Sequence, residues 1–406
     1  MIFGAVIGIL IIFVIIKKGL KSRDDDVKRK PKRIFGVYAP IGKWYYFKYF
    51  VFRALLILRR LKYRLCGKRF FHKENVLEKL QTLSNHKLAF DAVFFHAVTQ
   101  DGMYFCCGIE RRHEAKVVGL VYLVLPEYGI LESETLPKTT MDADTDSIYY
   151  QKCYSGGGLT MTPVKPMKKW KVQFRGKMRV HNSPNKTVDI ELEADWHSDY
   201  KWFFFEVDVP SKVLARAIAR ETWDKEYFQR LKEAHQSHYE QMGYLSGKLK
   251  VDGKTIKLEE VDAFRDHSFG HKRDWSLMHR YIYHMFYLSD RTKIAIGVVS
   301  QPSTTSLLEM GFVNHPDGRL DPVESVDLVL YEHGEDGVMP AEMAFTFVAG
   351  GETYDVRVEY VQEAVHYKGS DIEARLHERF IVCEVNGVPG RGISEWHYNN
   401  CQNKEE

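Results

Sequence analysis

Between residues 88 and 398, most of the chain alternates apolar and polar side chains with a period of two. Around Trp170 and Ile190, for example, every second side chain is apolar and those between are charged or amide. Such alternation is typical of antiparallel strands with one buried and one solvated face. Two-residue turn signals separate several of these runs and indicate hairpins: Asp101-Gly102, Asp252-Gly253, Asp317-Gly318, Gly350-Gly351 and Asn386-Gly387.

Residues 210–243 break this alternation with apolar spacing that fits helices. The spacing starts at Val213 and restarts at Trp223, which predicts two helices joined near Thr222 and ending at Gly243. Evenly spaced strands on both sides predict an up-and-down barrel or sandwich in each half. We therefore predict a mainly β chain, with a first β domain at 71–209, a helical connector at 210–243 and a second β domain at 244–400.

The amino-terminal segment, residues 2–16, contains no polar side chain. It is short for a spanning helix, which needs about 20 residues, but Gly19-Leu20 and snorkelling lysines can extend it. No basic region or small-residue cleavage site of a cleaved leader is visible, so we predict a transmembrane signal anchor at residues 1–20. Four cations follow the apolar run: Lys17, Lys18, Lys21 and Arg23. The positive-inside rule then predicts a single-pass membrane protein whose globular part faces the cytosol, for instance at the endoplasmic reticulum.

Residues 21–70 are predicted to form a basic linker and an amphipathic helix. Residues 44–61 mix aromatic, aliphatic and cationic side chains, as in a helix that lies in a membrane interface. The alternative is a helix packed on the globular body, since apolar residues cover more than one face.

Composition changes this picture only in detail. The net charge is +4 with much of the excess near the amino end, which argues against a nucleic-acid partner for the main body. Six cysteines without a CxxC spacing indicate free thiols in a reduced compartment. The one sequon, Asn185-Lys186-Thr187, matters only if the topology is inverted.

The densest polar stretch is residues 265–275, which carry two Asp, two His and three cations beside Trp275. Such groups are costly to bury unless each is paired. The stretch is therefore either the polar end of a binding site or a paired structural corner. In the second case the ion pairs would be formed by Arg265, Asp266, Arg273 and Asp274.

Zinc is a further alternative for this stretch, because His267 and His271 are four residues apart. On a helix both rings would face one ion, but Phe269 and Gly270 indicate a loop or strand exit. His279 and His284 lie further along the chain, but second ligands of defined spacing are missing, so we predict no metal site.

The stretch Arg265-Asp266-His267-Ser268-Phe269-Gly270, followed by Arg273-Asp274-Trp275, resembles the D-H-S-W-G…R-D-W element of a lipocalin-like group that includes AttH proteins and carotenoid hydratases. It is also similar to the region preceding the catalytic domains of invertebrate phosphoenolpyruvate-synthase-like proteins. Other segments of the pattern are Asp91-Ala92-Val93-Phe94-Phe95, Met167-Lys168-Lys169-Trp170, His238-Tyr239-Glu240-Gln241-Met242-Gly243 and Ile393-Ser394-Glu395-Trp396. The resemblance spans roughly residues 71–398 and implies two consecutive lipocalin-like β domains.

Two departures limit what the resemblance implies. Phe269 stands where the hydratase-like members usually have Trp. The phosphotransfer domains of the larger relatives have no room in this chain, so phosphoryl transfer is not inferred.

The resemblance implies Asp266 as a general acid that protonates an alkene, which requires apolar burial to raise its pKa. His267 would orient the Asp266 carboxyl, and Asp274 or Glu395 would position water. The ligand pocket would be lined by three aromatic side chains whose faces stabilise a developing cation: Trp275, Tyr281 and Tyr283.

Three functions remain open on these grounds. The leading hypothesis is a membrane-tethered protein that binds a lipid or isoprenoid in a β-barrel cavity without a cofactor. The second is a hydratase or isomerase that acts on a terpenoid or lipid alkene through Asp266. The third is a non-catalytic scaffold domain, because fold alone does not determine function.

Overall fold

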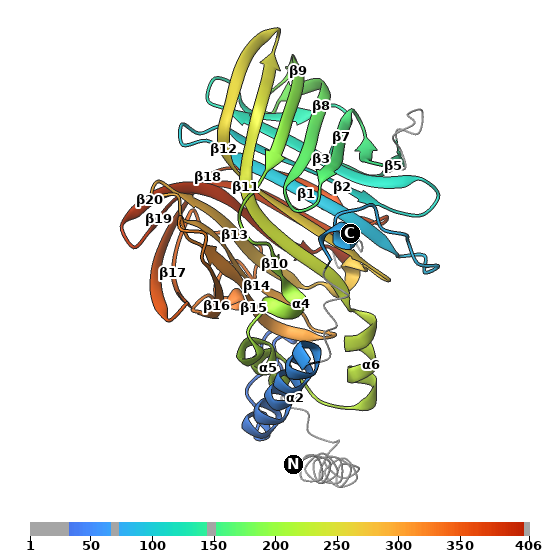
Figure 1. Cartoon of the computed structure of the whole chain (residues 1–406), viewed down its shortest axis with the longest axis vertical. Coiled ribbons are helices and arrows are strands. Elements are labelled where there is room, and N and C mark those ends of the chain that lie inside the picture. The colour runs from blue at the N-terminus through green and yellow to red at the C-terminus, as the bar shows by residue number, and fades with distance from the viewer. Residues whose placement is uncertain (1–31, 66–72, 144–151, 402–406) are drawn as a thin grey trace.

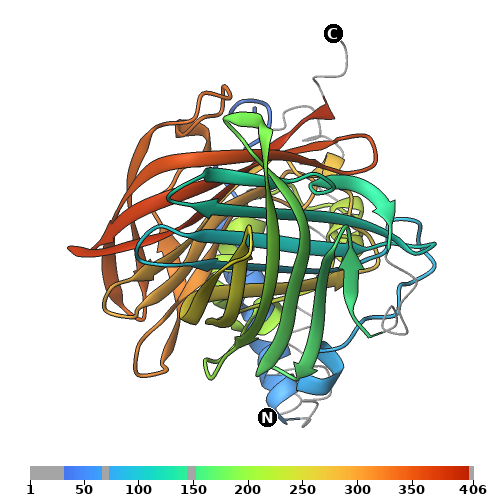
Figure 2. The same cartoon turned by 90° about the horizontal axis from the view of Figure 1, so that it is seen from above.

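The computed structural model describes residues 32–65, 73–143 and 152–401. As the alternation predicts, the chain is mainly β. The strands form two antiparallel sheets, each of which contains a ring of eight strands, and helices interrupt the first sheet in the sequence. Figure 1 shows the first ring at the top, the second ring below it and most helices at the lower end; Figure 2 shows the same arrangement from above.

The first ring has the strand order β11-β12-β1-β2-β3-β4-β8-β9, and pairing of β9 with β11 closes it. Its members are β1 (Phe90–Val98), β2 (Tyr104–Arg111), β3 (Lys116–Leu125), β4 (Gly129–Ser133), β8 (Lys169–Val180), β9 (Ser183–His197), β11 (Gln236–Val251) and β12 (Lys254–Gly270). Four shorter strands extend this sheet: β5 (Lys138–Asp142), β6 (Tyr154–Gly156), β7 (Leu159–Lys165) and β10 (Phe203–Phe204).

The second ring is a closed barrel in which each strand pairs with the next along the chain. Its strands are β13 (Arg280–Leu288), β14 (Lys293–Gln301), β15 (Thr305–Asn314), β16 (Leu320–Val326), β17 (Glu342–Ala349), β18 (Glu352–Lys368), β19 (Ala374–Val385) and β20 (Val388–Asn399). The predicted turn at Asn386-Gly387 joins β19 to β20, with φ of 50° and 81°, as a tight hairpin turn requires.

The helices are few and short, apart from the first described one. They are α2 (Tyr45–Leu65), α3 (Glu74–Leu77), α4 (Phe205–Asp208), α5 (Ser211–Arg220) and α6 (Lys225–Glu233), with 3-10 turns η3 (Trp275–Leu277) and η4 (Leu330–Glu332). The two helices predicted around Thr222 are α5 and α6. Asp224 begins α6, because its carboxylate accepts a hydrogen bond from the Tyr227 backbone amide at 2.7 Å.

The predicted helical connector is wrong after Glu233, because β11 already begins at Gln236. Gly243 does not stop a helix; it lies within β11, where a Cβ would sit 2.6 Å from the His197 carbonyl oxygen and from the Trp196 ring. Glycine is therefore needed there for a close approach of backbone to ring.

The predicted boundary at residues 243 and 244 also differs from the strand pairing. β11 and β12 follow the helices in the sequence, yet they pair with β9 and β1 of the first ring. By strand pairing, the chain divides between β12 and β13. Local alternation reveals a strand but not its distant partner, which is why the helices looked like the division.

Side chains fill the interiors of both rings. In the first ring, the inward residues include Phe95, Trp170 and Trp196, all at most 2 % exposed. In the second, Ile282 and Trp396 are fully buried among other apolar side chains. A third apolar cluster joins the outer faces of the two rings, with contributions from Tyr104, Tyr122, Phe264, Tyr283, Met285 and Phe380.

The predicted signal anchor at residues 1–20 lies outside the described residues. Among the helices that the structure describes, none is long and apolar enough to span a membrane. Residues 45–65, in the segment predicted to hold an amphipathic helix, form α2, which packs against α5.

Candidate functional site

A cavity of about 650 Å³ lies between the two rings. Side chains from β1, β3, β11 and β12 line one wall, and side chains from β13, β15 and β20 line the other. Residues of α4 to α6 and the chain just before and after them complete its edge. We predicted a cavity inside a barrel; the structure instead places this one against the outer faces of the rings, because their interiors are packed.

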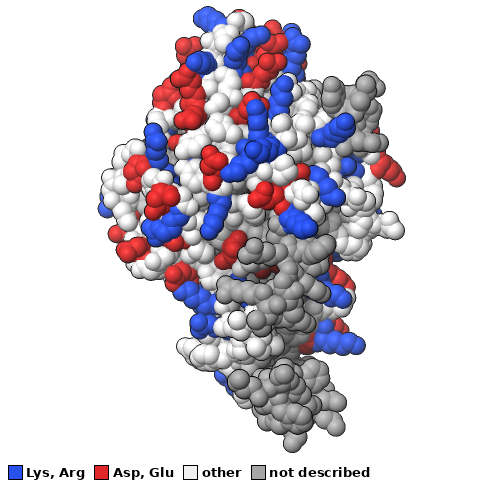
Figure 3. Space-filling view, viewed as in Figure 1, with Lys and Arg blue, Asp and Glu red and all other residues white. Residues whose placement is uncertain are grey.

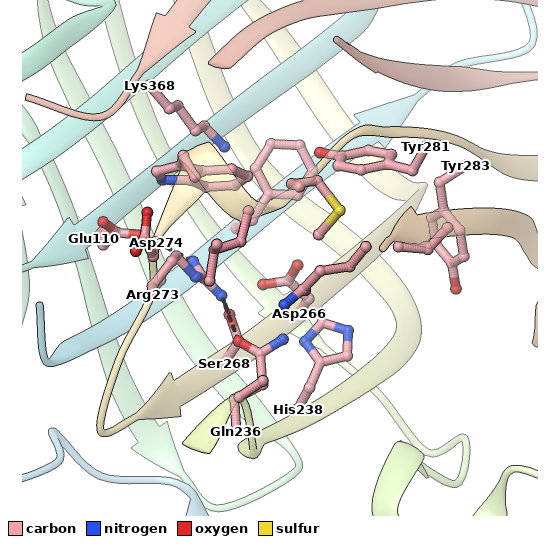
Figure 4. A pocket seen from close by; sticks show the side chains of 18 of the residues that line it. Glu110, Gln236, His238, Asp266, Ser268, Arg273, Asp274, Tyr281, Tyr283 and Lys368 are labelled. Atoms are coloured by element: carbon pink, nitrogen blue, oxygen red, sulfur yellow. Dashed lines mark hydrogen bonds and ion pairs between the residues drawn. The ribbon is translucent and has the colours of Figure 1, made fainter. Parts of the chain in front are cut away.

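Six of the seven side chains predicted for the site line this cavity: Asp266, Asp274, Trp275, Tyr281, Tyr283 and Glu395. Several of them are labelled in Figure 4. They come from β12, the segment after it, β13 and β20, so Asp266 and Glu395, 129 positions apart, both line the cavity. The exception is His267.

His267 does not lie in the cavity, and the expectation that it orients Asp266 is wrong. Successive side chains of a strand point to opposite faces, so His267 enters the first ring while Asp266 faces outward. Inside the ring, His267 Nε2 lies 2.7 Å from Asp91 Oδ1, and its Nδ1 lies 2.8 Å from the Tyr239 hydroxyl. The Tyr154 hydroxyl also donates to Asp91, at 2.9 Å.

Arg265 also points into the first ring and is fully buried. Its guanidinium donates to Glu78 Oε1 at 2.7 Å and to Gln241 Oε1 at 2.8 Å, and it stacks 4.8 Å from the centre of the Trp196 ring. Glu78 follows α3 and comes from the segment before β1. This group is therefore a structural lock that fastens that segment into the ring.

The paired-corner alternative holds only in part. Arg265 pairs with Glu78, and Arg273 pairs with Glu110 at 2.8 Å, so neither cation pairs with Asp266. Asp274 pairs with Lys272 at 3.1 Å. The stretch therefore places the Arg265–Glu78 pair inside the first ring, whereas the pairs of Arg273 and Asp274 line the cavity with Asp266.

The Asp266 carboxyl is partly buried and has no hydrogen bond or ion pair with any residue that the structure describes. Burial raises its pKa to about 6, against an ordinary value of 3.8. The nearby charges of His238 and Arg273 oppose this rise in pKa, while those of Glu240 and Glu395 add to it. The Asp266 carboxyl therefore stays protonated to a higher pH than an ordinary Asp, and it lines the cavity.

Sequence reasoning missed a second polar group in the cavity wall. Glu240 is 3 % exposed, accepts a hydrogen bond from the Tyr283 hydroxyl at 2.7 Å and lies 3.0 Å from His238 Nε2. His238 fell within the helical connector predicted at residues 210–243. The available signal was that helical spacing stops after Leu231, so that His238 and Glu240 share one face of a strand.

Cations flank the aromatic part of the wall, as Figure 4 shows for Arg273 and Lys368. The Arg273 guanidinium lies 5.5 Å and the Lys368 ammonium 5.3 Å from the centre of the Trp275 ring. Arg273 is held in place by a hydrogen bond to the Ser268 hydroxyl at 2.7 Å. Glu110 and Asp274 also line this end of the cavity, so it offers charges of both signs to a polar group of a ligand.

Tyr281 and Glu395 form the opposite polar contact, since the tyrosine hydroxyl donates to Glu395 Oε2 at 2.5 Å. The His397 ring stacks on both Tyr281 and Trp275, with ring centres 5.0 and 5.7 Å away. The aromatic residues are thus fixed by stacking and do not have to be ordered by a ligand.

The two histidines considered for zinc are not brought together. His271 Nδ1 contacts the Ser84 hydroxyl at 2.9 Å, whereas His267 is buried in the ring. Within the described ranges, no three His, Cys, Asp or Glu side chains converge as metal ligands.

The chain belongs to a family of unknown function, DUF8627, whose model matches residues 6–398. No curated protein matches it.

Among solved structures, an AttH-type protein from Nitrosomonas europaea is similar over 77 % of this chain and 94 % of its own, with 11 % identity and a TM-score of 0.53. Kievitone hydratase from Nectria haematococca is similar over 80 % of this chain and 94 % of its own, with 15 % identity and a TM-score of 0.44. CghA is similar over 79 % of this chain and 94 % of its own, with 10 % identity and a TM-score of 0.44. The first likeness shows a shared AttH-type, lipocalin-like fold and nothing about activity.

Proposed function

We propose that this member of DUF8627 binds an apolar small molecule, such as a lipid or isoprenoid, in the cavity between its two β rings. The observation that carries the proposal is the partly buried Asp266 carboxyl, which has no partner among the described residues and lies in a cavity wall that also offers apolar and aromatic side chains. A polar group without a protein partner is costly at such a site unless it has a role toward what enters.

The shape of the wall supports a ligand with an apolar body and one polar end. Phe94, Leu308 and Met310 offer apolar surface between the rings. The cations near Trp275 would hold the polar end, and the Asp266 carboxyl would face the ligand body.

Mass spectrometry of an organic extract tests binding directly. The full chain, purified under native conditions, is expected to release one class of apolar compound in near-stoichiometric amount. An extract without any such compound, from protein that also fails to take up a panel of lipids and isoprenoids, would favour the scaffold alternative.

A second candidate function, favoured by the raised pKa of Asp266, is hydration or isomerisation of an alkene in the ligand. In this step the Asp266 proton would pass to one alkene carbon, and the π electrons would form the new C–H bond. The cation left on the other carbon would be stabilised by the faces of Tyr281 and Trp275. Water would then add there and return a proton to the Asp266 carboxylate; loss of a neighbouring C–H proton would give the isomer instead.

Incubation of the extracted ligand with the protein in D₂O separates binding from turnover. Turnover places deuterium on carbon, where it survives exchange back into H₂O, and Asp266→Asn should abolish that incorporation. Binding without carbon-bound deuterium would leave the chain as a binding protein.

A further inference from the structure

The helix α2 has an unusual distribution of side chains. Its outward surface is apolar and aromatic, with exposed fractions of 62 % for Phe50 and 51 % for Leu58. Other exposed large apolar side chains of this surface are Trp44, Tyr46, Phe47, Leu55, Ile57 and Leu61. Several recur three, four or seven residues apart, so they form a continuous stripe along the helix.

Three cations of α2 contact the body. Lys48 donates to the Glu221 carbonyl oxygen at 2.6 Å, Arg59 pairs with Glu206 at 2.7 Å, and Arg60 donates to the Val209 carbonyl oxygen. A helix on a water-soluble surface normally shows the reverse arrangement. Contiguous apolar surface of this kind marks an interaction site.

The charge of the surrounding sequence identifies the kind of partner. Residues 27–73 contain no Asp or Glu. They contain fifteen cations, of which Arg33, Lys48, Arg59 and Arg60 bond to the body. The other eleven are Lys28, Arg29, Lys30, Lys32, Lys43, Arg53, Lys62, Arg64, Lys68, Arg69 and Lys73. Elsewhere, on the face drawn in Figure 3, both signs of charge are interspersed over the rings. An acid-free, cationic segment around an apolar stripe is complementary to a bilayer with anionic lipids.

A second copy of the chain fits this surface less well. In a symmetric dimer the same patch meets itself, so the cationic segment would face its own like charges.

We propose that α2 is a membrane-docking helix, with its exposed apolar stripe buried in the interface of an anionic bilayer and with Lys48, Arg59 and Arg60 anchoring it to the body. The inference does not depend on the proposed ligand. Under the proposed function it has a consequence, since α5 packs on α2 and contributes Leu214 to the cavity wall. Docking would set this edge of the cavity beside the bilayer, where apolar ligands dissolve.

A fluorescent probe on the stripe tests the proposal in the full chain. Phe50→Cys, in a background of Cys66→Ser and Cys401→Ser, is labelled with an environment-sensitive dye; the other cysteines are buried. The matched control is Lys254→Cys, an exposed position in the β11–β12 hairpin at the other end of the molecule (Figure 1). Both proteins are mixed with vesicles of phosphatidylcholine and phosphatidylserine that carry a lipid-bound quencher.

Docking predicts several-fold stronger quenching at position 50 than at position 254, with a blue shift on vesicle addition. An added Leu58→Glu should reverse most of the quenching at position 50, while near-ultraviolet circular dichroism shows an intact fold. Equal quenching at both positions would overturn the proposal. So would a dye at position 50 that is already shielded without vesicles, because the stripe would then be covered by residues 2–16 or by a second copy.

Discussion

Asp266 and His267 are consecutive residues of β12, yet their side chains lie on opposite faces of the strand and serve different parts of the molecule. Asp266 faces the cavity between the rings without a partner in the described part of the chain, whereas His267 lies 2.7 Å from Asp91 inside the first ring. The same alternation separates Glu240, in the cavity wall, from Tyr239 and Gln241, in the ring. β11 and β12 therefore each have one structural face and one candidate functional face, and substitutions can test the two faces independently.

Asp266→Asn should change the pH dependence of stability. The native pKa of about 6 exceeds the ordinary 3.8, so between about pH 4 and 6 the folded chain holds a proton that the unfolded chain releases. The stability that this proton provides is fully present below pH 4 and lost as the pH rises through 6. The loss is at most about 3 kcal/mol, at 1.36 kcal/mol per pKa unit.

Thermal unfolding from pH 4 to pH 8 measures this effect. The variant should match or exceed the wild type at pH 8, and its advantage should shrink toward pH 4. If Asp266→Asn instead lowers the melting temperature strongly at pH 8, the carboxylate has a stabilising partner and the proposed role in the cavity fails.

Filling the cavity should block ligand uptake without unfolding the chain. Ala92 lies on the cavity side of β1, and Ala97, five positions later, lies in the interior of the first ring. Ala92→Phe would project into open space, whereas Ala97→Phe would overpack the ring at a cost of about 1–3 kcal/mol. Ala92→Phe should lose its bound ligand, measured by mass spectrometry, and keep its melting temperature. Ala97→Phe should keep its ligand and unfold at a lower temperature. Full ligand content in Ala92→Phe would place the ligand elsewhere.

Much of the fold could be predicted because a strand with one buried face alternates apolar and polar residues along the sequence. The turns at Asp252-Gly253 and Asn386-Gly387 were equally readable, since residues tolerant of positive φ are required there. What local pattern could not show was which strands close a ring. The ring closes where β11 pairs with β9, about 50 residues earlier in the chain. Nothing in the sequence of either strand identifies the other as its partner.

The candidate site was predictable as a set of residues but not as a geometry. Asp266, Trp275 and Glu395 were identified from the resemblance, and they meet in one cavity. The side chains of Asp266 and His267 point to opposite faces because this stretch is a strand as far as Gly270. The sequence had instead suggested a loop or strand exit near Gly270. The site's position between the rings depends on packing of two outer faces, which becomes visible only in three dimensions.

Removing Glu78 should strongly destabilise the chain, because it would leave the fully buried Arg265 without its anionic partner. Breaking such a buried pair typically costs about 3–5 kcal/mol. Urea unfolding of Glu78→Gln checks this value. The control is Glu259→Gln, which removes the partner of Lys257 in an exposed pair on the same strand and should leave stability nearly unchanged. Equal effects of the two substitutions would contradict the structural lock.

Asn185 reports which side of a membrane the body occupies. It lies exposed on β9, so a glycan could be attached without disturbing the fold. The cations after residues 2–16 predict that the body stays in the cytosol, and Asn185 should therefore remain unmodified in eukaryotic cells. An endoglycosidase mobility shift measures this outcome. As a control, replacing residues 1–20 by a cleavable leader should send the body into the lumen and produce the shift, which shows that the sequon can be used. A shift in the unaltered chain would reverse the orientation and, with it, place the cysteines in an oxidising compartment.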